Sequence, residues 1–261
     1  MTLFFHELKQ NRLSLLIWSG VIAFMTAVCI LIYPEMAKQM DEINNMFANM
    51  GSFTDAFGMD KVNLGEFIGF FSIECSEMLG LGGGIFAAIL GISVLSKEEK
   101  HGTAEFLLAH PVSRTSIMTQ KLMASVTQIL ILNLSIVLAT AVSVLIIGVD
   151  APIKPLALIF VAYFIMQLEV FAVTFGLSVL LKGANVGIGI GIPLLFYFLN
   201  IAANMTDKLE FLKYVTPYGY ADGADIVAEN GIDLTVLILG AVITAVFIIF
   251  AYVRYPKKDI A

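Results

Sequence analysis

The chain has 261 residues, of which 59% are hydrophobic and only 14% are charged, and its formal net charge is −6. A typical soluble domain carries about 25% charged residues, so this composition excludes an ordinary soluble protein and predicts a polytopic membrane protein. The two cysteines form neither a disulfide framework nor a metal-binding pattern by their spacing.

Sequence motifs of catalytic sites are absent from the chain. It contains no G-x-x-x-x-G-K-[ST] phosphate loop, no H-E-x-x-H pair and no G-x-S-x-G nucleophile elbow. We therefore expect that the chain is not an enzyme by itself, and that it holds no metal and no cofactor of its own.

The N-terminal residues 1–12 mix apolar Leu3, Phe4, Phe5 and Leu8 with charged neighbours. This mixture predicts a short amphipathic helix that lies in the membrane interface ahead of the first span. A frayed terminus without regular structure is the alternative.

Long apolar runs predict an all-α membrane protein with six transmembrane helices in a single domain, residues 1–261. A run of about twenty apolar residues is long enough to cross a bilayer as a helix. The predicted spans are residues 13–33, 73–95, 122–148, 156–181, 186–203 and 234–253. Pro34 is expected to end the first span, and the polar segments 34–72 and 204–233 are predicted to lie on the external side.

The second span carries a glycine cluster between Gly80 and Gly84. Phosphate-binding loops also contain such clusters, but the Lys and Ser or Thr that end those loops are missing here. Small residues let helices approach closely, so we predict a helix-packing site. Glu74 and Glu77 at the start of this span are interpreted as interface residues near the outer surface.

The stretch between the second and third spans, residues 95–114, is the densest cluster of charge in the chain. Gly102 disfavours a helix interior, and Thr103 can cap a new helix that has Glu105 in its first turn. Pro111 stops that helix, so the pattern predicts about two helical turns that are tied down at both ends.

The later spans contain few polar residues. Ser113 can cap the helix that leads into the third span, with Arg114 at its start, and we expect regular helix from Ser116. Glu169 is the one ionisable residue well inside a span, and its charge should face the bundle interior or a wet path. Pro193 is expected to kink the Gly-rich fifth span, which also carries Asn200.

The basic residues indicate the orientation of the chain. With six spans and the N-terminus inside, the cytoplasmic segments hold ten of the fifteen Lys and Arg residues and the other side holds five. Cytoplasmic loops are enriched in Lys and Arg, so this bias predicts a multi-pass protein of the cell membrane with both termini and the 95–114 loop in the cytoplasm.

The run E-E-K-H-G-T-A-E-F-L-L-A-H-P-V-S-R resembles the first cytoplasmic loop of ABC-2-type permeases, which are the membrane subunits of ATP-driven exporters. The matching residues are Glu98, Gly102, Thr103, Glu105, Leu107, Leu108, Pro111, Ser113 and Arg114. Ala104 stands where the family usually has a larger aliphatic residue. A solvated loop that only joins two spans is the alternative interpretation.

The resemblance implies a permease subunit of an ATP-driven exporter, with the N-terminal helix as its elbow helix. Two permease chains, identical or related, would form the substrate path between them. Two separate ABC ATPase subunits, which bind ATP and Mg, would dock on residues 97–114 and move the short coupling helix. The residues expected to transmit this force are Glu98, Gly102, Thr103, Glu105, Phe106, Leu107, Pro111 and Arg114.

Glu169 and Asn200 are the predicted residues of the substrate path, and a structural carboxyl satisfied by a neighbouring helix is the alternative for Glu169. Two other functions stay open. The chain could be a secondary transporter that is driven by an ion gradient through Glu169, or a membrane scaffold that senses a ligand through its external segments. Acidic outer segments and apolar walls would suit peptides, amphipathic drugs, lipids or cations as cargo.

Overall fold

The computed structural model describes residues 2–39, 51–98, 102, 112–181 and 185–258. Within these residues the regular elements are helices, and there is no strand. Six helices are long and apolar enough to cross a membrane. They are Arg12–Ala37, Phe67–Val94, Arg114–Ile147, Ile153–Ser178, Val186–Met205 and Leu234–Lys257. The prediction of an all-α protein with six spans and an additional N-terminal helix is confirmed.

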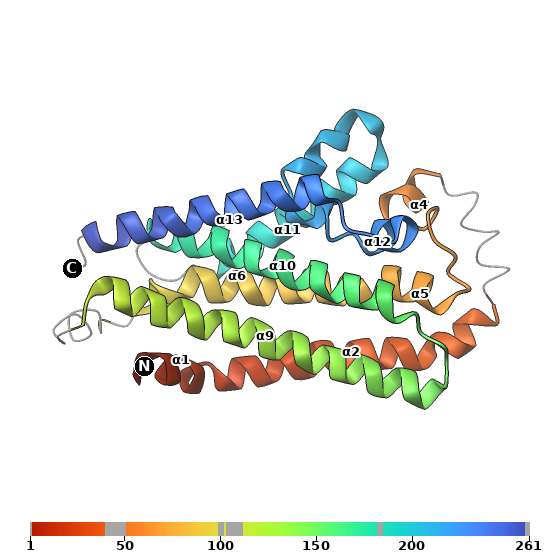
Figure 1. Cartoon of the computed structure of the whole chain (residues 1–261), viewed down its shortest axis with the longest axis horizontal. Helices are drawn as coiled ribbons and strands as arrows, with labels where there is room; N and C mark the ends of the chain where they lie inside the picture. Colours follow the sequence, from red (N-terminus) through yellow and green to blue (C-terminus); the bar gives the residue numbers. More distant parts are fainter. Residues whose placement is uncertain (1, 40–50, 99–101, 103–111, 182–184, 259–261) are drawn as a thin grey trace.

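The long helices lie side by side along the longest axis of the molecule (Figure 1). Both chain ends lie at one end of the bundle, which we call the terminal end, and α4, α5 and α12 lie at the distal end. The helices outside the second span are α1 (Thr2–Gln10), α2 (Arg12–Ala37), α4 (Ser52–Ala56), α9 (Arg114–Ile147), α10 (Ile153–Ser178), α11 (Val186–Met205), α12 (Gly223–Glu229) and α13 (Leu234–Arg254). Short 3₁₀ turns are η3 (Asp207–Tyr214), η4 (Pro217–Gly219) and η5 (Tyr255–Lys257).

The first span does not end where the sequence indicates. α2 passes through Pro34 and ends at Ala37, so the expected stop at Pro34 is wrong. Proline lacks the N–H of its own position and crowds the turn before it, whereas the residues after it can remain helical. The buried Tyr33 also holds this end of α2, because its hydroxyl donates to the carbonyl oxygen of Gly65 at 2.9 Å.

The second span is not one continuous α-helix. It begins with α5 (Phe67–Phe70), earlier than the predicted residue 73, and passes through two π-helical segments, η1 (Phe71–Cys75) and η2 (Met78–Gly82), before α6 (Gly83–Val94). The added first turn is aromatic and buried, which explains why it joins the helix. π-Helical turns are rare and often occur at functional sites.

The third span begins almost as predicted. α9 starts at Arg114, and the side-chain oxygen of Ser113 accepts a hydrogen bond from the backbone N–H of Ser116 at 3.2 Å. This cap satisfies one of the free N–H groups at the helix start, so the helix begins two residues before the expected Ser116.

Glycines allow the second and fourth spans to pack closely, as predicted for the cluster at Gly80–Gly84. A Cβ atom at Gly80 would lie 2.7 Å from the ring of Tyr163, and one at Gly83 would overlap the amide of Gln167. Gln167 in turn donates to the carbonyl of Leu79 at 3.1 Å. The close approach therefore also makes a hydrogen bond between spans possible.

Candidate functional site

Four charged side chains meet at the terminal end, where the 95–114 loop leaves the bundle. We call this group the ionic cluster: Glu7 of α1, Lys97 and Glu98 after α6, and Lys121 of α9. The ammonium nitrogen of Lys121 lies 3.0 Å from Glu7 Oε1, and it also donates to Glu98 and, at 2.7 Å, to the carbonyl of Val94. Lys97 donates to the other oxygen of Glu7. The cluster therefore connects α1 and α9 directly to the start of the loop.

The ionic cluster is buried rather than solvated. The side chain of Lys121 is 0% exposed and that of Glu7 is 2% exposed. Burial by itself would raise the pKa of Glu7, but the ammonium groups of Lys121 and Lys97 outweigh it, so this pKa lies below its ordinary value. Glu7 is therefore ionised at neutral pH, and breaking its pairs would leave the buried Lys121 with Glu98 as its remaining acidic partner among the described residues.

The stabilisation from Glu7 should disappear only in acid. Because its folded pKa is lowered, the contribution is complete above the ordinary value of 4.5 and declines as the pH falls through the folded pKa. We expect Glu7→Gln to lower the Tm of the purified protein by about 5 °C at neutral pH, since the amide oxygen still accepts a hydrogen bond but carries no charge. This difference should be constant above about pH 5.5 and shrink below pH 4.5 in thermal unfolding scans.

Glu35→Gln is the matched control for this titration, because the carboxylate of Glu35 is exposed and its ion pair within the described residues is with the exposed Lys38. That substitution should change the Tm little at any pH, as expected for surface ion pairs. A Glu7→Gln difference that grew as the pH fell would contradict the assignment of a lowered pKa.

The other end of the loop is fixed by Arg114. Its guanidinium donates to the carbonyl oxygens of Pro256 at 3.1 Å and Lys258 at 2.7 Å, in the segment that follows α13. The ammonium of Lys258 donates to the carbonyl of Leu181 at 2.8 Å. Arg114 therefore holds the C-terminal segment and the end of the fourth span against the start of α9.

The structure describes only part of the predicted coupling residues. Glu98 belongs to the ionic cluster and Arg114 to the C-terminal anchor, while Gly102 has a φ of +67°, which suits the predicted helix break. The remaining predicted residues lie outside the described residues: Thr103, Glu105, Phe106, Leu107 and Pro111. The predicted coupling helix itself also lies outside them.

The two predicted substrate-path residues are not in the same place. Glu169 is 3% exposed and accepts a hydrogen bond from the Tyr220 hydroxyl at 2.9 Å, and its carboxylate packs against Gly240 of α13. This arrangement favours a structural carboxyl that a neighbouring segment satisfies. Asn200 instead lines a pocket toward the distal end, and Glu169 does not line it.

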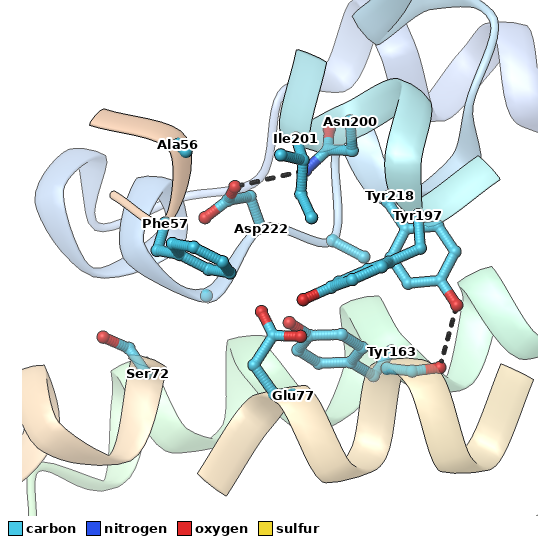
Figure 2. A pocket seen from close by; sticks show the side chains of 13 residues that line it. Ala56, Phe57, Ser72, Glu77, Tyr163, Tyr197, Asn200, Ile201, Tyr218 and Asp222 are labelled. Atoms are coloured by element: carbon cyan, nitrogen blue, oxygen red, sulfur yellow. Dashed lines mark hydrogen bonds between the residues drawn. The ribbon is translucent and has the colours of Figure 1, made fainter. Parts of the chain in front are cut away.

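This distal pocket brings together residues from five parts of the chain, one of which is the end of α4 with Ala56 and Phe57 (Figure 2). Glu77 comes from the turn between η1 and η2, Tyr163 from α10, Asn200 from α11, and Tyr218 and Asp222 from the segment before α12. The Nδ2 atom of Asn200 donates to Asp222 Oδ2 at 3.4 Å, and the Tyr218 hydroxyl donates to the carbonyl of Gly80 at 3.1 Å. The pocket therefore has polar walls within an apolar bundle.

The interpretation of Glu77 as a surface interface residue is wrong, because its side chain lines this pocket. Glu74, three residues earlier, is exposed as expected. The π-helical segment η1 ends two residues before Glu77, and a π-helical turn changes the register of the residues that follow it relative to a regular α-helix. The one sequence signal that could have identified Glu77 is its position as an ionisable residue inside a span.

The comparison with protein families agrees with this architecture. The family model described as ABC-2 family transporter protein matches residues 1–260. The chain belongs to the ABC-2 family. This ABC-2 protein is thus a multi-pass membrane protein of a transporter permease family, with the ionic cluster at the end of its second span and Arg114 at the start of its third. Searches of curated proteins and of solved structures found no significant match.

Proposed function

We propose that the chain is the membrane subunit of an ATP-driven exporter. In this proposal a second permease chain, identical or related, completes the substrate path, and two separate ATPase subunits dock on the cytoplasmic loop 97–114. ATP and Mg²⁺ bind to those subunits and not to this chain. The match to the ABC-2 family over residues 1–260 is the observation that carries the proposal.

The anchors of the loop support a mechanical role for it. A displacement that begins in the loop reaches Glu98, and through Lys121 and Glu7 it acts on α9 and α1 together. At the other end of the loop, a displacement of Arg114 acts on the segment after α13 through its hydrogen bond to the Lys258 carbonyl. Coupling of this kind needs a loop that binds one ATPase state more tightly than another, because a ligand shifts an equilibrium only by its difference in affinity.

A secondary transporter driven through Glu169 receives less support. A coupling carboxylate has to exchange its ion or proton with a wet path, whereas Glu169 is buried, accepts a hydrogen bond from Tyr220 and packs against Gly240. A membrane scaffold without transport activity would not need the paired anchors of the 97–114 loop.

Copurification tests the proposal. We expect an ATPase with a P-loop to copurify with the tagged chain from native membranes, and Phe106→Ala or Glu105→Lys to reduce its yield by about tenfold, as for contacts at the centre of an interface. The control is Phe211→Ala, which truncates an exposed aromatic residue of η3, far from the loop in the sequence. ATPase binding that survived both loop substitutions would contradict docking at this loop.

Orientation can be tested on the same preparation. A cysteine introduced at the exposed Val112 should react with an impermeant maleimide only after the membrane is permeabilised, because only then does the maleimide reach the cytoplasmic side. Labelling of intact cells at this position would place the loop on the outer surface and end the proposal.

A further inference from the structure

The two cysteines of the chain lie side by side in the folded protein, although 46 residues separate them in the sequence. Both are free thiols. The Sγ atom of Cys75, in the π-helical segment η1, donates to Cys29 Sγ of α2 across 3.3 Å. A disulfide bond is about 2.05 Å long, so the two sulfurs would have to approach each other by only about 1 Å to form one. The structure therefore holds a reduced pair that is close to the geometry of a cross-link between the first two spans.

Helix packing places the two thiols opposite each other. One and two turns before Cys29, the same face of α2 carries Thr26 and Ile22, at spacings of three and four residues. Thr26 Oγ1 lies 4.0 Å from Met78 Sδ, and a Cβ atom at Gly82 would lie 3.1 Å from Ile22. These contacts follow the cysteine pair by equal steps in opposite directions along the two helices, as expected for antiparallel helices in a fixed register. The register of the first two spans therefore positions the pair.

Cys29 is the thiol that a small oxidant can reach first. Its side chain is only partly buried, whereas Cys75 is 0% exposed. Met25 and Ile32, which lie on the same side of α2 as Cys29 at spacings of four and three residues, are 48% and 49% exposed. An accessible thiol beside a second, resolving thiol is the arrangement of reversible redox sites. Because this edge of α2 is apolar, a small uncharged oxidant such as hydrogen peroxide suits it better than a charged reagent.

We propose that Cys29 and Cys75 are a redox modification site, at which hydrogen peroxide forms a reversible disulfide bond that ties the first span to the second. In the first step the Cys29 sulfur attacks one peroxide oxygen and the O–O bond breaks. Cys29 becomes a sulfenic acid, and the departing hydroxide takes the thiol proton and leaves as water. In the second step the Cys75 sulfur attacks the Cys29 sulfur, the S–O bond breaks, and the hydroxide leaves as a second water with the Cys75 proton. Two thiols are thereby oxidised to one disulfide while one peroxide is reduced to two waters.

The bond would join the two spans near the point where the chain leaves the bundle between them. α2 ends at Ala37 and α5 begins at Phe67, so a Cys29–Cys75 bond closes the intervening stretch into a covalent loop. Such a loop stabilises the folded state, because it reduces the conformational freedom of the unfolded chain. The reaction is a property of this chain alone and needs no ATPase partner. The experiment below therefore uses the purified full chain without nucleotide, and its failure would leave the exporter proposal untouched.

Treatment of the purified full chain with hydrogen peroxide tests the site. After the remaining free thiols are blocked, peptide mass spectrometry should find the peptides of Cys29 and Cys75 joined within one chain. The Tm should rise by about 5 °C, as expected for a new cross-link. Dithiothreitol should reverse both changes. Cysteines that stay reduced, that gain oxygen atoms without joining, or that link one chain to another would overturn the proposal.

Matched variants separate the pairing from general thiol reactivity. The double variant Cys29→Ser with Val28→Cys moves the thiol by one residue, to an exposed position of α2. Its disulfide with Cys75 should form more than about tenfold more slowly, because the two groups are no longer held together. Cys75→Ala should leave Cys29 as a sulfenic acid that dimedone traps, with no rise in Tm.

The Tm of each reduced variant shows that it is folded before peroxide is added, and Cys29→Ala replaces Cys75→Ala if the latter does not fold. A disulfide that formed equally fast from position 28, or a rise in Tm that persisted in either single alanine variant, would refute the site.

Discussion

Replacement of Lys121 by methionine should lower the Tm of the purified protein by about 10 °C, which corresponds to a loss of about 3–5 kcal/mol for removing one partner of a buried ion pair. The Lys121 side chain is 0% exposed and contacts Glu7, Glu98 and the carbonyl of Val94. Methionine fills a similar volume, so the loss reports the missing charge rather than a cavity. Thermal unfolding of the two proteins in the same detergent measures the difference.

Lys9→Met is the matched control for this experiment, because Lys9 is an exposed lysine of α1. It should change the Tm by about 1–2 °C at most, as expected for a surface charge. Adding Glu7→Gln to Lys121→Met should recover part of the loss, since it removes the carboxylate that is left behind. If Lys9→Met and Lys121→Met had the same Tm, the ionic cluster would not stabilise the terminal end.

Gly91→Leu should destabilise the bundle by more than about 3 kcal/mol, and Gly91→Ala by about 1–3 kcal/mol, because this position is already in contact with a neighbouring backbone. A Cβ atom at Gly91 would lie 2.6 Å from the carbonyl oxygen of Phe171 and would overlap the hydroxyl of Thr174. Neither α6 nor α10 can give way locally, since the obstacle is backbone. The Tm and the yield of monodisperse protein measure the effect.

Gly20 of α2 offers the opposite case, because nothing lies within 4 Å of the Cβ that a substitution would add. Gly20→Ala should leave the protein unchanged or stabilise it by about 0.5–1 kcal/mol, as expected for removing a glycine from a helix interior. The two alanine substitutions are therefore predicted to change the stability of the protein in opposite directions. A Tm for Gly91→Ala at or above the wild-type value would show that α6 and α10 are not held at this distance.

The spans could be predicted from the sequence because each is a local apolar run of sufficient length. The packing role of Gly80–Gly84 and the cap at Ser113 could also be predicted, since small residues and N-cap residues act through their immediate surroundings. The end of α2 was missed because one proline does not outweigh the tertiary contact of Tyr33 with Gly65.

The site residues were harder to predict, because they come from distant parts of the chain. Glu7, Lys97 and Lys121 are each unremarkable charges in the sequence, and only the packing of α1 against the end of α6 and the start of α9 makes them one cluster. Likewise nothing near Glu77 in the sequence indicates its neighbour Asp222. The register shift caused by two π-helical segments could not be inferred from hydrophobic periodicity, which assumes a regular helix.

One chain of amide hydrogen bonds limits how the centre of the bundle can move. Asn133 of α9 donates to Gln167 Oε1 at 2.6 Å, and Gln167 of α10 donates to the carbonyl of Leu79 in the second span at 3.1 Å. Sliding any one of these helices along its neighbours would break a polar contact where water cannot replace it. These hydrogen bonds therefore oppose shear between α9, α10 and the second span. A displacement at one end of the bundle would have to tilt the three helices together.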